Sequence, residues 1–312
     1  MAGINAQAIK ELRERTLAGM SDCKSALQEA EGDMEKAVEI ILKKGLAKSA
    51  KRAGAVATEG EVRASVSPDK RSATIVEVNI QTDFAARNDL FRQFVGDVLA
   101  LAEKAAAGSD LSEQSLGDKK VSDVANELTA RIGEKVAVRR WDRVTVGEGK
   151  SGLAHAYVHL GGKIGVALAV ETDSDAVASH AEVVKFVDDT AMQIAAMTPT
   201  ALRRQDVSED VVGKQKEIYE AQMRDDPKPK PQAAWPKIIE GKVNKWFSEI
   251  VLLEQESVVV PGQTIDKLRE AAAKAAGGSV TITRFVRFER GEGLSKGEKD
   301  DFAAEVAKMA GG

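Results

Sequence analysis

Apolar residues recur at helical spacing through the first 45 residues and divide into three short segments. Ile9 and Leu12 share one face behind Asn5, which suits the N-cap of a helix that ends near Thr16. A second helix is expected to start at Ser21, and Gly45 suits the C′ position of a third. The apolar stripes of these two helices are Cys23, Ala26, Leu27 and Ala30, then Met34, Ala37, Val38, Ile41 and Leu42. The pattern predicts a three-helix module over residues 1–45.

The spacing changes after residue 58. Residues 46–58 are rich in Ala, Lys and Arg and have no apolar stripe, so they are predicted to be a linker. Two alternating runs then flank a turn at Pro68-Asp69 and predict a β-hairpin, with Val62, Ala64 and Val66 in one run and Thr74, Val76, Val78 and Ile80 in the other. A helix from about Asp89, a helix over 122–133 and a strand over 136–146 complete this part of the chain.

A related pattern returns in the second half of the chain. Residues 76–97 read VEVNIQTDFAARNDLFRQFVGD, and residues 166–189 read VALAVETDSDAVASHAEVVKFVDD. In this alignment Thr82-Asp83 recurs as Thr172-Asp173, and Phe84 faces Ser174. A helix near 264–276 and a strand over 280–288 end the second copy as the helix and strand over 122–146 end the first. The chain is therefore predicted to contain two copies of one α+β unit, each a small antiparallel sheet covered by helices.

The second copy contains an insertion of helical character. Apolar stripes over about 207–224 and 237–256 flank an Asp-Pro-Lys-Pro-Lys-Pro stretch that no helix can continue through. This arrangement predicts an antiparallel helical hairpin, and residues 300–309 predict one more short helix. The expected class is α+β, with a module over 1–45, a linker over 46–58, core halves over 59–150 and 151–290, the hairpin over 205–256, and a C-terminal helical module over 291–312.

Composition and charge narrow the function classes. The chain has 312 residues, 43% of them hydrophobic and only 4% aromatic, so its core must be mostly aliphatic. A formal net charge of -4 gives no electrostatic case for nucleic-acid binding. The first residues lack the features of a secretory signal, no run of 18 apolar residues occurs, and Cys23 is the single cysteine. We therefore expect a cytoplasmic protein with no disulfide, no membrane span and no Cys-rich zinc module.

The inventory of catalytic groups is small. His155 and His159 lie four residues apart on a predicted strand, but no third metal ligand lies near them in the sequence. Gly161-Gly162-Lys163 lacks the spacing of a phosphate-binding loop and fits a hairpin turn. These observations favour a protein that is not an enzyme and that has no cofactor, no metal and no direct nucleotide binding.

The segment Thr82-Asp83-Phe84 lies between the predicted hairpin and the following helix. Thr and Asp at such a position can cap the turn, which is a purely structural explanation. Phe84 is not explained by capping, because the alignment gives the second copy Ser174 there. A phenylalanine in this connection is either core filler or an exposed anchor for a partner protein.

Several segments along the chain resemble the bacterial elongation factor Ts family. The N-terminal signature of that family is Leu-Arg-x-x-Thr-Gly-Ala-Gly-Met-x-Asp-Cys-Lys, and its later loop is Thr-Asp-Phe-Val-Ala-x-Asn. The matching residues are 12–24 (LRERTLAGMSDCK), 82–88 (TDFAARN), 132–140 (IGEKVAVRR), 157–166 (YVHLGGKIGV), 285–293 (FVRFERGEG) and 301–306 (DFAAEV). Leu17 and Ala85 differ from the family's usual Gly and Val, and the hairpin tip over 224–231 is longer than its usual Gly-Lys-Pro.

The resemblance implies a guanine-nucleotide exchange factor for elongation factor Tu, a translational GTPase. It implies that the N-terminal module is ubiquitin-associated-like, that the hairpin is a coiled coil, and that an Asp-Phe pair displaces the GTPase's Mg²⁺. The residues that it assigns to that displacement are Thr82, Asp83, Phe84 and Ala85. The residues that it assigns to other GTPase contacts are Arg13, Met20, Ile132, Gly133 and His159.

Two other function classes remain alternatives at the level of the sequence. One is an RNA- or ribosome-binding module that uses the N-terminal helices and the basic linker. The acidic balance and the small number of aromatic residues count against it. The other is a metal-dependent hydrolase built on His155 and His159, and the missing ligands and nucleophile count against that class.

Overall fold

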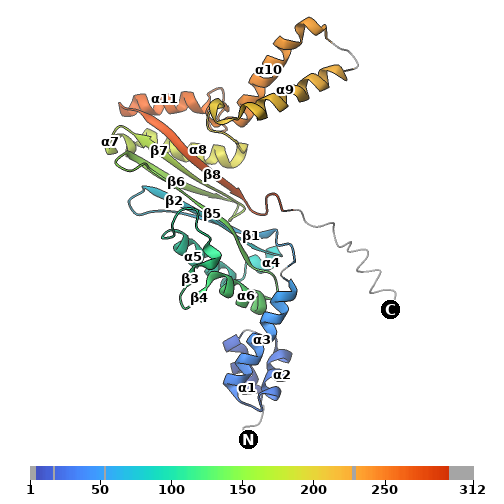
Figure 1. Ribbon diagram of the computed structural model, residues 1–312. Helices are drawn as coiled ribbons and strands as arrows, with labels where there is room; N and C mark the ends of the chain where they lie inside the picture. Colours follow the sequence, from blue (N-terminus) through green and yellow to red (C-terminus); the bar gives the residue numbers. More distant parts are fainter. Residues whose placement is uncertain (1–4, 17, 53, 227–229, 295–312) are drawn as a thin grey trace.

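The computed structural model describes residues 5–16, 18–52, 54–226 and 230–294. Three helices stand at one end of the molecule, two three-stranded sheets with their covering helices form the middle, and a helical hairpin projects from the other end (Figure 1). Mixed helix and small antiparallel sheets confirm the α+β class. The short helix expected over 300–309 lies outside the described residues.

The N-terminal helices form as the apolar spacing predicts. They are α1 (Ala6–Thr16), α2 (Met20–Glu29) and α3 (Met34–Arg52). The Asn5 side chain accepts a hydrogen bond from the Ala8 N–H at 2.8 Å, which confirms the first N-cap. Helix α2 begins one residue before Ser21, with Gly19 as its N-cap. Leu12, Cys23, Ala26 and Leu27 are fully buried between these helices, so Cys23 serves as a small core residue.

Helix α3 is longer than the sequence pattern predicts. It does not end at Gly45 but continues to Arg52, through most of the segment expected to be a linker. Gly45 is buried against α6 (Val121–Ile132), where a Cβ atom would come within 2.5 Å of the Ala130 Cβ. Glycine is therefore required at residue 45 by close helix packing, and not by a helix terminus.

The Gly45→Ala substitution should separate α3 from α6. Alanine favours a helix by up to about 1 kcal/mol over glycine, but two Cβ atoms at 2.5 Å must move apart. We expect a net destabilisation of the α3–α6 contact by about 1 kcal/mol or more. Faster amide hydrogen exchange in the C-terminal half of α3 is the measurement.

The double variant Gly45→Ala, Ala130→Gly should restore that contact, because it moves the same methyl group to the other helix. Gly213 provides the matched control, since it lies in α9 (Glu209–Arg224) with nothing within 4 Å of an added Cβ. Gly213→Ala should only stabilise its helix. A Gly45→Ala variant whose α3 amides are protected like those of the parent would contradict the packing argument.

Two similar α+β halves form the body. In the first, β1 (Glu59–Val66), β2 (Ser72–Ile80) and β5 (Ala137–Thr145) pair antiparallel in the order β1-β2-β5. In the second, β6 (Ser151–His159), β7 (Ile164–Thr172) and β8 (Val280–Glu289) pair in the order β6-β7-β8. The helices are α4 (Asp83–Ala86), α5 (Asp89–Ala102) and α6 in the first half, and α7 (Asp175–Ala178), α8 (Ala181–Met197) and α11 (Ile265–Ala276) in the second.

Backbone details recur between the halves and support an internal duplication. The register of β2 on β5 shifts between Glu77 and Val78, and that of β7 on β8 shifts between Ala169 and Val170. Gly60, paired with Asn79, and Gly152, paired with Glu171, have the positive φ values 131° and 156°. At both glycines a Cβ would come within 2.1 Å of a carbonyl oxygen on the neighbouring strand. Both halves therefore need glycine at the same place.

The two sheets pack face to face, and the helices cover their outer faces (Figure 1). Side chains of both sheets fill the space between them: Val62, Ala73, Ile75, Val144, Ala154, Ala167, Ala169 and Phe288. Helices α5 and α6 bury one outer core, which contains Phe91 and Phe94. Helices α8 and α11 bury the other, which contains Phe186 and Ile194.

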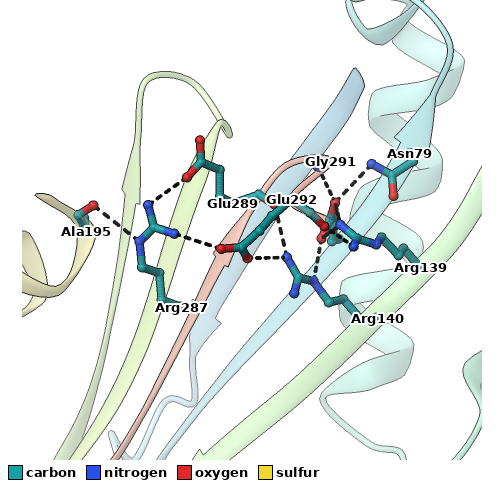
Figure 2. A network of polar contacts seen from close by, with 9 residues as sticks. Asn79, Arg139, Arg140, Ala195, Arg287, Glu289, Gly291 and Glu292 are labelled. Carbon is teal, nitrogen blue, oxygen red and sulfur yellow. Dashed lines mark hydrogen bonds and ion pairs between the residues drawn. The ribbon is translucent and has the colours of Figure 1, made fainter. Parts of the chain in front are cut away.

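A polar network joins the halves where β8 ends (Figure 2). The side chain of Glu77, on β2, is fully buried. Its carboxylate accepts hydrogen bonds from Arg139 Nη1 at 2.9 Å, Arg140 Nε at 2.6 Å and the Gly291 N–H at 2.7 Å. Arg140 also donates to the carbonyl oxygen of Glu289 and to the carboxylate of Glu292. The residues that follow the second half are thus bound to the first sheet.

The inserted hairpin is formed by α9 and α10 (Trp235–Ile250). Its own apolar core includes Met223, Ile239, Val243 and Phe247. The second arm is shorter than the expected 237–256, because α10 ends at Ile250 and the chain turns back into the body. Leu252 is fully buried in the core of the second half, and Gln255 is bonded there to Gln193.

Two deletions should separate the hairpin from the body. Replacing residues 207–250 by a short Gly-Ser linker removes the projecting arms and leaves Leu252 and Gln255 in place, so cooperative unfolding of the body should persist. Replacing 207–256 also removes Leu252 and Gln255 and should cost about 2–5 kcal/mol more. Urea unfolding of both variants is the measurement. Equal stability of the two would show that residues 251–256 add nothing to the core.

Candidate partner-binding site

Thr82, Asp83, Phe84 and Ala85 lie on or at the start of α4, a single helical turn. Thr82 is its N-cap, and its hydroxyl oxygen accepts a hydrogen bond from the Ala85 N–H at 3.2 Å. Asp83 forms an exposed ion pair with Arg87 at 3.3 Å, which contributes little energy. Capping therefore accounts for Thr82, as the sequence suggested, and the segment is a short helix instead of a loop.

Phe84 projects into solvent from this turn. Its side chain is 80% exposed, more than that of any other large apolar residue that the structure describes. Ala85, the next residue, is half-buried and packs against the core beneath α5. Phe84 is therefore not core filler, and the two explanations left open by the sequence are decided in favour of an exposed side chain.

Comparison of the two halves corrects the alignment of this segment. Helix α7 has Ser174 as its N-cap, whose hydroxyl accepts from the Val177 N–H at 3.3 Å. Ser174 thus corresponds to Thr82, and the counterpart of Phe84 is Ala176, which is exposed. Thr172 and Asp173 correspond instead to Ile80 and Gln81 at the strand ends. The two Thr-Asp pairs are therefore not equivalent, because they lie two positions apart when the halves are aligned by their helix caps and strand ends.

Ile132 and Gly133 lie next to α4. Ile132 ends α6 and packs against the same core as Ala85, and Gly133 has the left-handed conformation (φ 85°) that ends this helix. Directly after them, Glu134 accepts hydrogen bonds from the Thr82 N–H at 2.9 Å and from the Thr82 hydroxyl at 2.7 Å. The structure therefore brings the segments around residues 82–85 and 132–134 together.

His159 lies at the end of β6, in a separate exposed turn. Its Nδ1 is 2.8 Å from the Tyr157 hydroxyl, and the two rings stack with centroids 5.8 Å apart. The following residue, Leu160, is 67% exposed and has a positive φ of 49°. An exposed leucine in this conformation is uncommon and marks the turn as a second candidate contact surface.

Arg13 and Met20 lie in the N-terminal helices. Both side chains are exposed, Arg13 on α1 and Met20 at the first turn of α2. These helices are at the far end of α3 from α4 (Figure 1). The expected contact residues therefore fall on three surfaces of the molecule.

Comparison with known proteins finds relatives over nearly the whole chain. Residues 81–292 match the family described as Elongation factor TS. The Elongation factor Ts of Clostridium perfringens is 47% identical over 313 residues, which cover 99% of each chain. This protein belongs to the elongation factor Ts family. Relatives in a Nitratiruptor species and in Symbiobacterium thermophilum are 45% and 42% identical and span at least 97% of both chains.

His155 and His159, the metal ligands of the alternative considered from the sequence, have different neighbours in the structure. Among the described residues, no three His, Cys, Asp or Glu side chains are grouped to bind a metal ion. His155 Nε2 is 3.1 Å from Asp188, and His159 is bonded to Tyr157, so the two histidines have separate partners. None of the helices in the described ranges is long and apolar enough to cross a membrane.

Two residues on these candidate surfaces, Glu134 and Leu160, were not singled out from the sequence. Glu134 gave no signal, because its contact with Thr82 joins residues 52 positions apart. Leu160 was hidden inside a predicted turn, although a large apolar residue between His159 and a Gly-Gly pair is unusual at such a position.

Proposed function

We propose that this protein is a guanine-nucleotide exchange factor that binds elongation factor Tu in the cytoplasm. In this proposal it displaces Mg²⁺ from the GTPase, promotes GDP release, and so regenerates the GTP form during translation elongation. The observation that carries the proposal is Phe84, an aromatic side chain held 80% exposed on a capped helical turn. Membership of the elongation factor Ts family supports the choice of partner.

The proposed roles follow the three exposed surfaces. Phe84 enters the GTPase near its Mg²⁺, with Thr82, Asp83 and Ala85 around it. Ile132, Gly133 and His159 contribute further contacts from the body, and Arg13 and Met20 contribute contacts from the N-terminal module. The proposal needs no nucleotide, metal or nucleic acid bound to this chain, because the displaced ion and nucleotide belong to the partner.

Thermodynamic linkage sets the size of the required effect. A factor that weakens GDP binding by a given ratio must itself bind the nucleotide-free GTPase more tightly than the GDP-bound GTPase, by the same ratio. A change on the order of 10⁴-fold corresponds to about 5.5 kcal/mol of differential binding. Burial of one phenylalanine supplies about 1.5–3 kcal/mol. The rest of the differential binding free energy must come from the other contact surfaces and from the loss of the Mg²⁺–phosphate interactions in the GTPase.

The test measures release of a fluorescent GDP analogue from elongation factor Tu. Adding this protein with excess unlabelled GDP should accelerate release, and the rate should saturate with its concentration. The acceleration should be smaller in a Mg²⁺ chelator, because the ion is then already absent. Unchanged release at every concentration would refute the proposed function.

A further inference from the structure

We infer that Glu134 is a positioning residue that fixes the direction of Phe84. The inference rests on the proposed function for its effect on exchange, but its structural basis is independent. Both carboxylate oxygens of Glu134 are used on one residue, since Oε2 accepts from the Thr82 N–H at 2.9 Å and Oε1 from the Thr82 hydroxyl at 2.7 Å. Thr82 is the residue from which α4 starts.

The contact with Glu134 also orients the cap of α4. Because the Thr82 hydroxyl donates its proton to Glu134, its lone pairs remain available to the Ala85 N–H at 3.2 Å. Within the turn, the Ala86 N–H donates to the Thr82 carbonyl at 3.1 Å. A helix of four residues is far too short to be stable by itself, so its geometry depends on its caps. Glu134 therefore helps to hold α4 through its N-cap, together with the packing of Ala85 on the core.

The two halves hold their short helices in different ways. In the second half, Val177 of α7 is buried. It packs closely on Gly278, where an added Cβ would lie 2.7 Å from the Val177 side chain. In the first half the corresponding residues are Ala85, smaller and half-buried, and Glu134. Buried apolar packing holds α7, whereas at α4 the apolar packing is smaller and a bidentate polar contact is added.

A different hydrogen bond, at the end of β2 and of β7, is common to both halves and does not involve Glu134. The Gln81 side chain accepts from the Lys135 N–H at 2.8 Å, and Asp173 accepts from the N–H of the corresponding Ser279. This bond fixes the strand end in both copies, so the α+β unit does not depend on Glu134. The carboxylate contact occurs only in the copy whose short helix presents an exposed phenylalanine.

Glu134 is itself firmly placed. It follows Gly133 at the end of α6, and α6 is held by Val121, Ala125 and Leu128 in the core of the first half. The direction of Phe84 is therefore set relative to the core and not by the connecting segment alone.

The experiment compares Glu134→Ala, Glu134→Gln and the control Glu127→Ala in the full chain. Glu127 is on α6 and pairs with Lys119, so its loss removes the same charge without affecting Thr82. Amide exchange at Ala85 and Ala86 in the free protein reports α4 directly. GDP release from elongation factor Tu, measured as maximal rate and half-saturating concentration, reports the consequence.

Glu134→Ala should accelerate exchange of the two α4 amides by about tenfold, the scale of one to two lost hydrogen bonds. It should lower the maximal release rate severalfold and leave α5 amides unchanged. Glu134→Gln should retain most of the protection of the α4 amides and most of the maximal release rate, because a glutamine amide can accept from the Thr82 N–H and donate to the Thr82 hydroxyl oxygen. Glu127→Ala should behave like the parent.

Introducing Glu134→Ala into the Phe84→Ala variant distinguishes positioning of Phe84 by Glu134 from a direct contact of Glu134 with the GTPase. If Glu134 acts through Phe84, Glu134→Ala should slow release no further in that background, whereas additive losses would overturn the inference. Unchanged α4 amides in Glu134→Ala would overturn it as well. If the parent protein did not accelerate GDP release from elongation factor Tu, the proposed function would fail, and the amide measurement would still decide whether Glu134 positions α4.

Discussion

Phe84→Ala should leave the stability of the protein within about 0.5 kcal/mol of the parent while lowering the maximal rate of GDP release by roughly 10- to 100-fold. The side chain is 80% exposed, so its removal leaves no cavity. The substitution also gives α4 the residue that α7 has at the corresponding position, the exposed Ala176. The backbone of this turn is therefore compatible with alanine, and only the partner loses contact area.

Thermal or urea denaturation and the release assay together test this prediction. Val177→Ala is the control with the opposite pattern, because Val177 is buried and its truncation should cost about 1.5 kcal/mol or more without affecting release. Ser174→Ala is unsuitable as a control because it removes the N-cap of α7. A large loss of stability with normal release in Phe84→Ala would end the proposed role of this side chain.

The internal alignment of the candidate segment over residues 82–85 was predicted wrongly from the sequence. Letter identity between Thr82-Asp83 and Thr172-Asp173 suggested equivalence, whereas the caps and strand ends show a displacement of two residues. Both Thr and Ser are favourable N-cap residues, so the equivalent positions can hold different residues, Thr82 and Ser174. A helix end is a geometric feature, and residue identity alone does not locate it.

Other differences arise from contacts between segments far apart in the chain. The apolar stripes located the helices and strands well, because periodicity depends on local geometry. Gly45 has the sequence signature of a helix end, but its partner is Ala130, 85 residues later. The alternation in β2 placed Val76, Val78 and Ile80 on one face but did not reveal that a second sheet buries the other face. Glu77 is bonded to Arg139 and Arg140 of β5 and to Gly291 after β8, and the alternation gave no sign of these contacts.

Glu77→Ala should destabilise the protein by about 3–5 kcal/mol at neutral pH, a range typical of removing one partner from a buried ion pair. Glu77 has no exposed side-chain surface, and its loss removes the buried acceptor that Arg139 Nη1, Arg140 Nε and the Gly291 N–H share. The contact between the end of β8 and the first sheet would weaken with it. Urea unfolding at neutral pH measures the effect.

The surface pair Asp142–Arg284 is the control for this prediction. It also joins the two halves, at 2.6 Å, but both side chains are partly exposed. Asp142→Ala should therefore cost no more than about 1 kcal/mol. A similar loss in both variants would show that burial of Glu77 does not determine the result.

The pH dependence distinguishes the charge of Glu77 from its shape. Burial by itself raises the pKa of the Glu77 carboxyl, but the Gly291 N–H, the Arg139 and Arg140 guanidinium groups and the Asn79 amide together lower it below the ordinary value. Since the folded-state pKa lies below the unfolded-state pKa, the stabilisation is complete above the unfolded-state value and is lost as the pH falls through the folded-state value.

Glu77→Gln, which keeps the shape and removes the charge, should therefore be less stable than the parent at neutral pH. The difference should narrow progressively as the pH falls into the acid range, because the parent carboxylate is then protonated as well. Urea unfolding of both proteins over that range is the measurement. A difference that stayed constant would mean that the network depends on the shape of Glu77 and not on its charge.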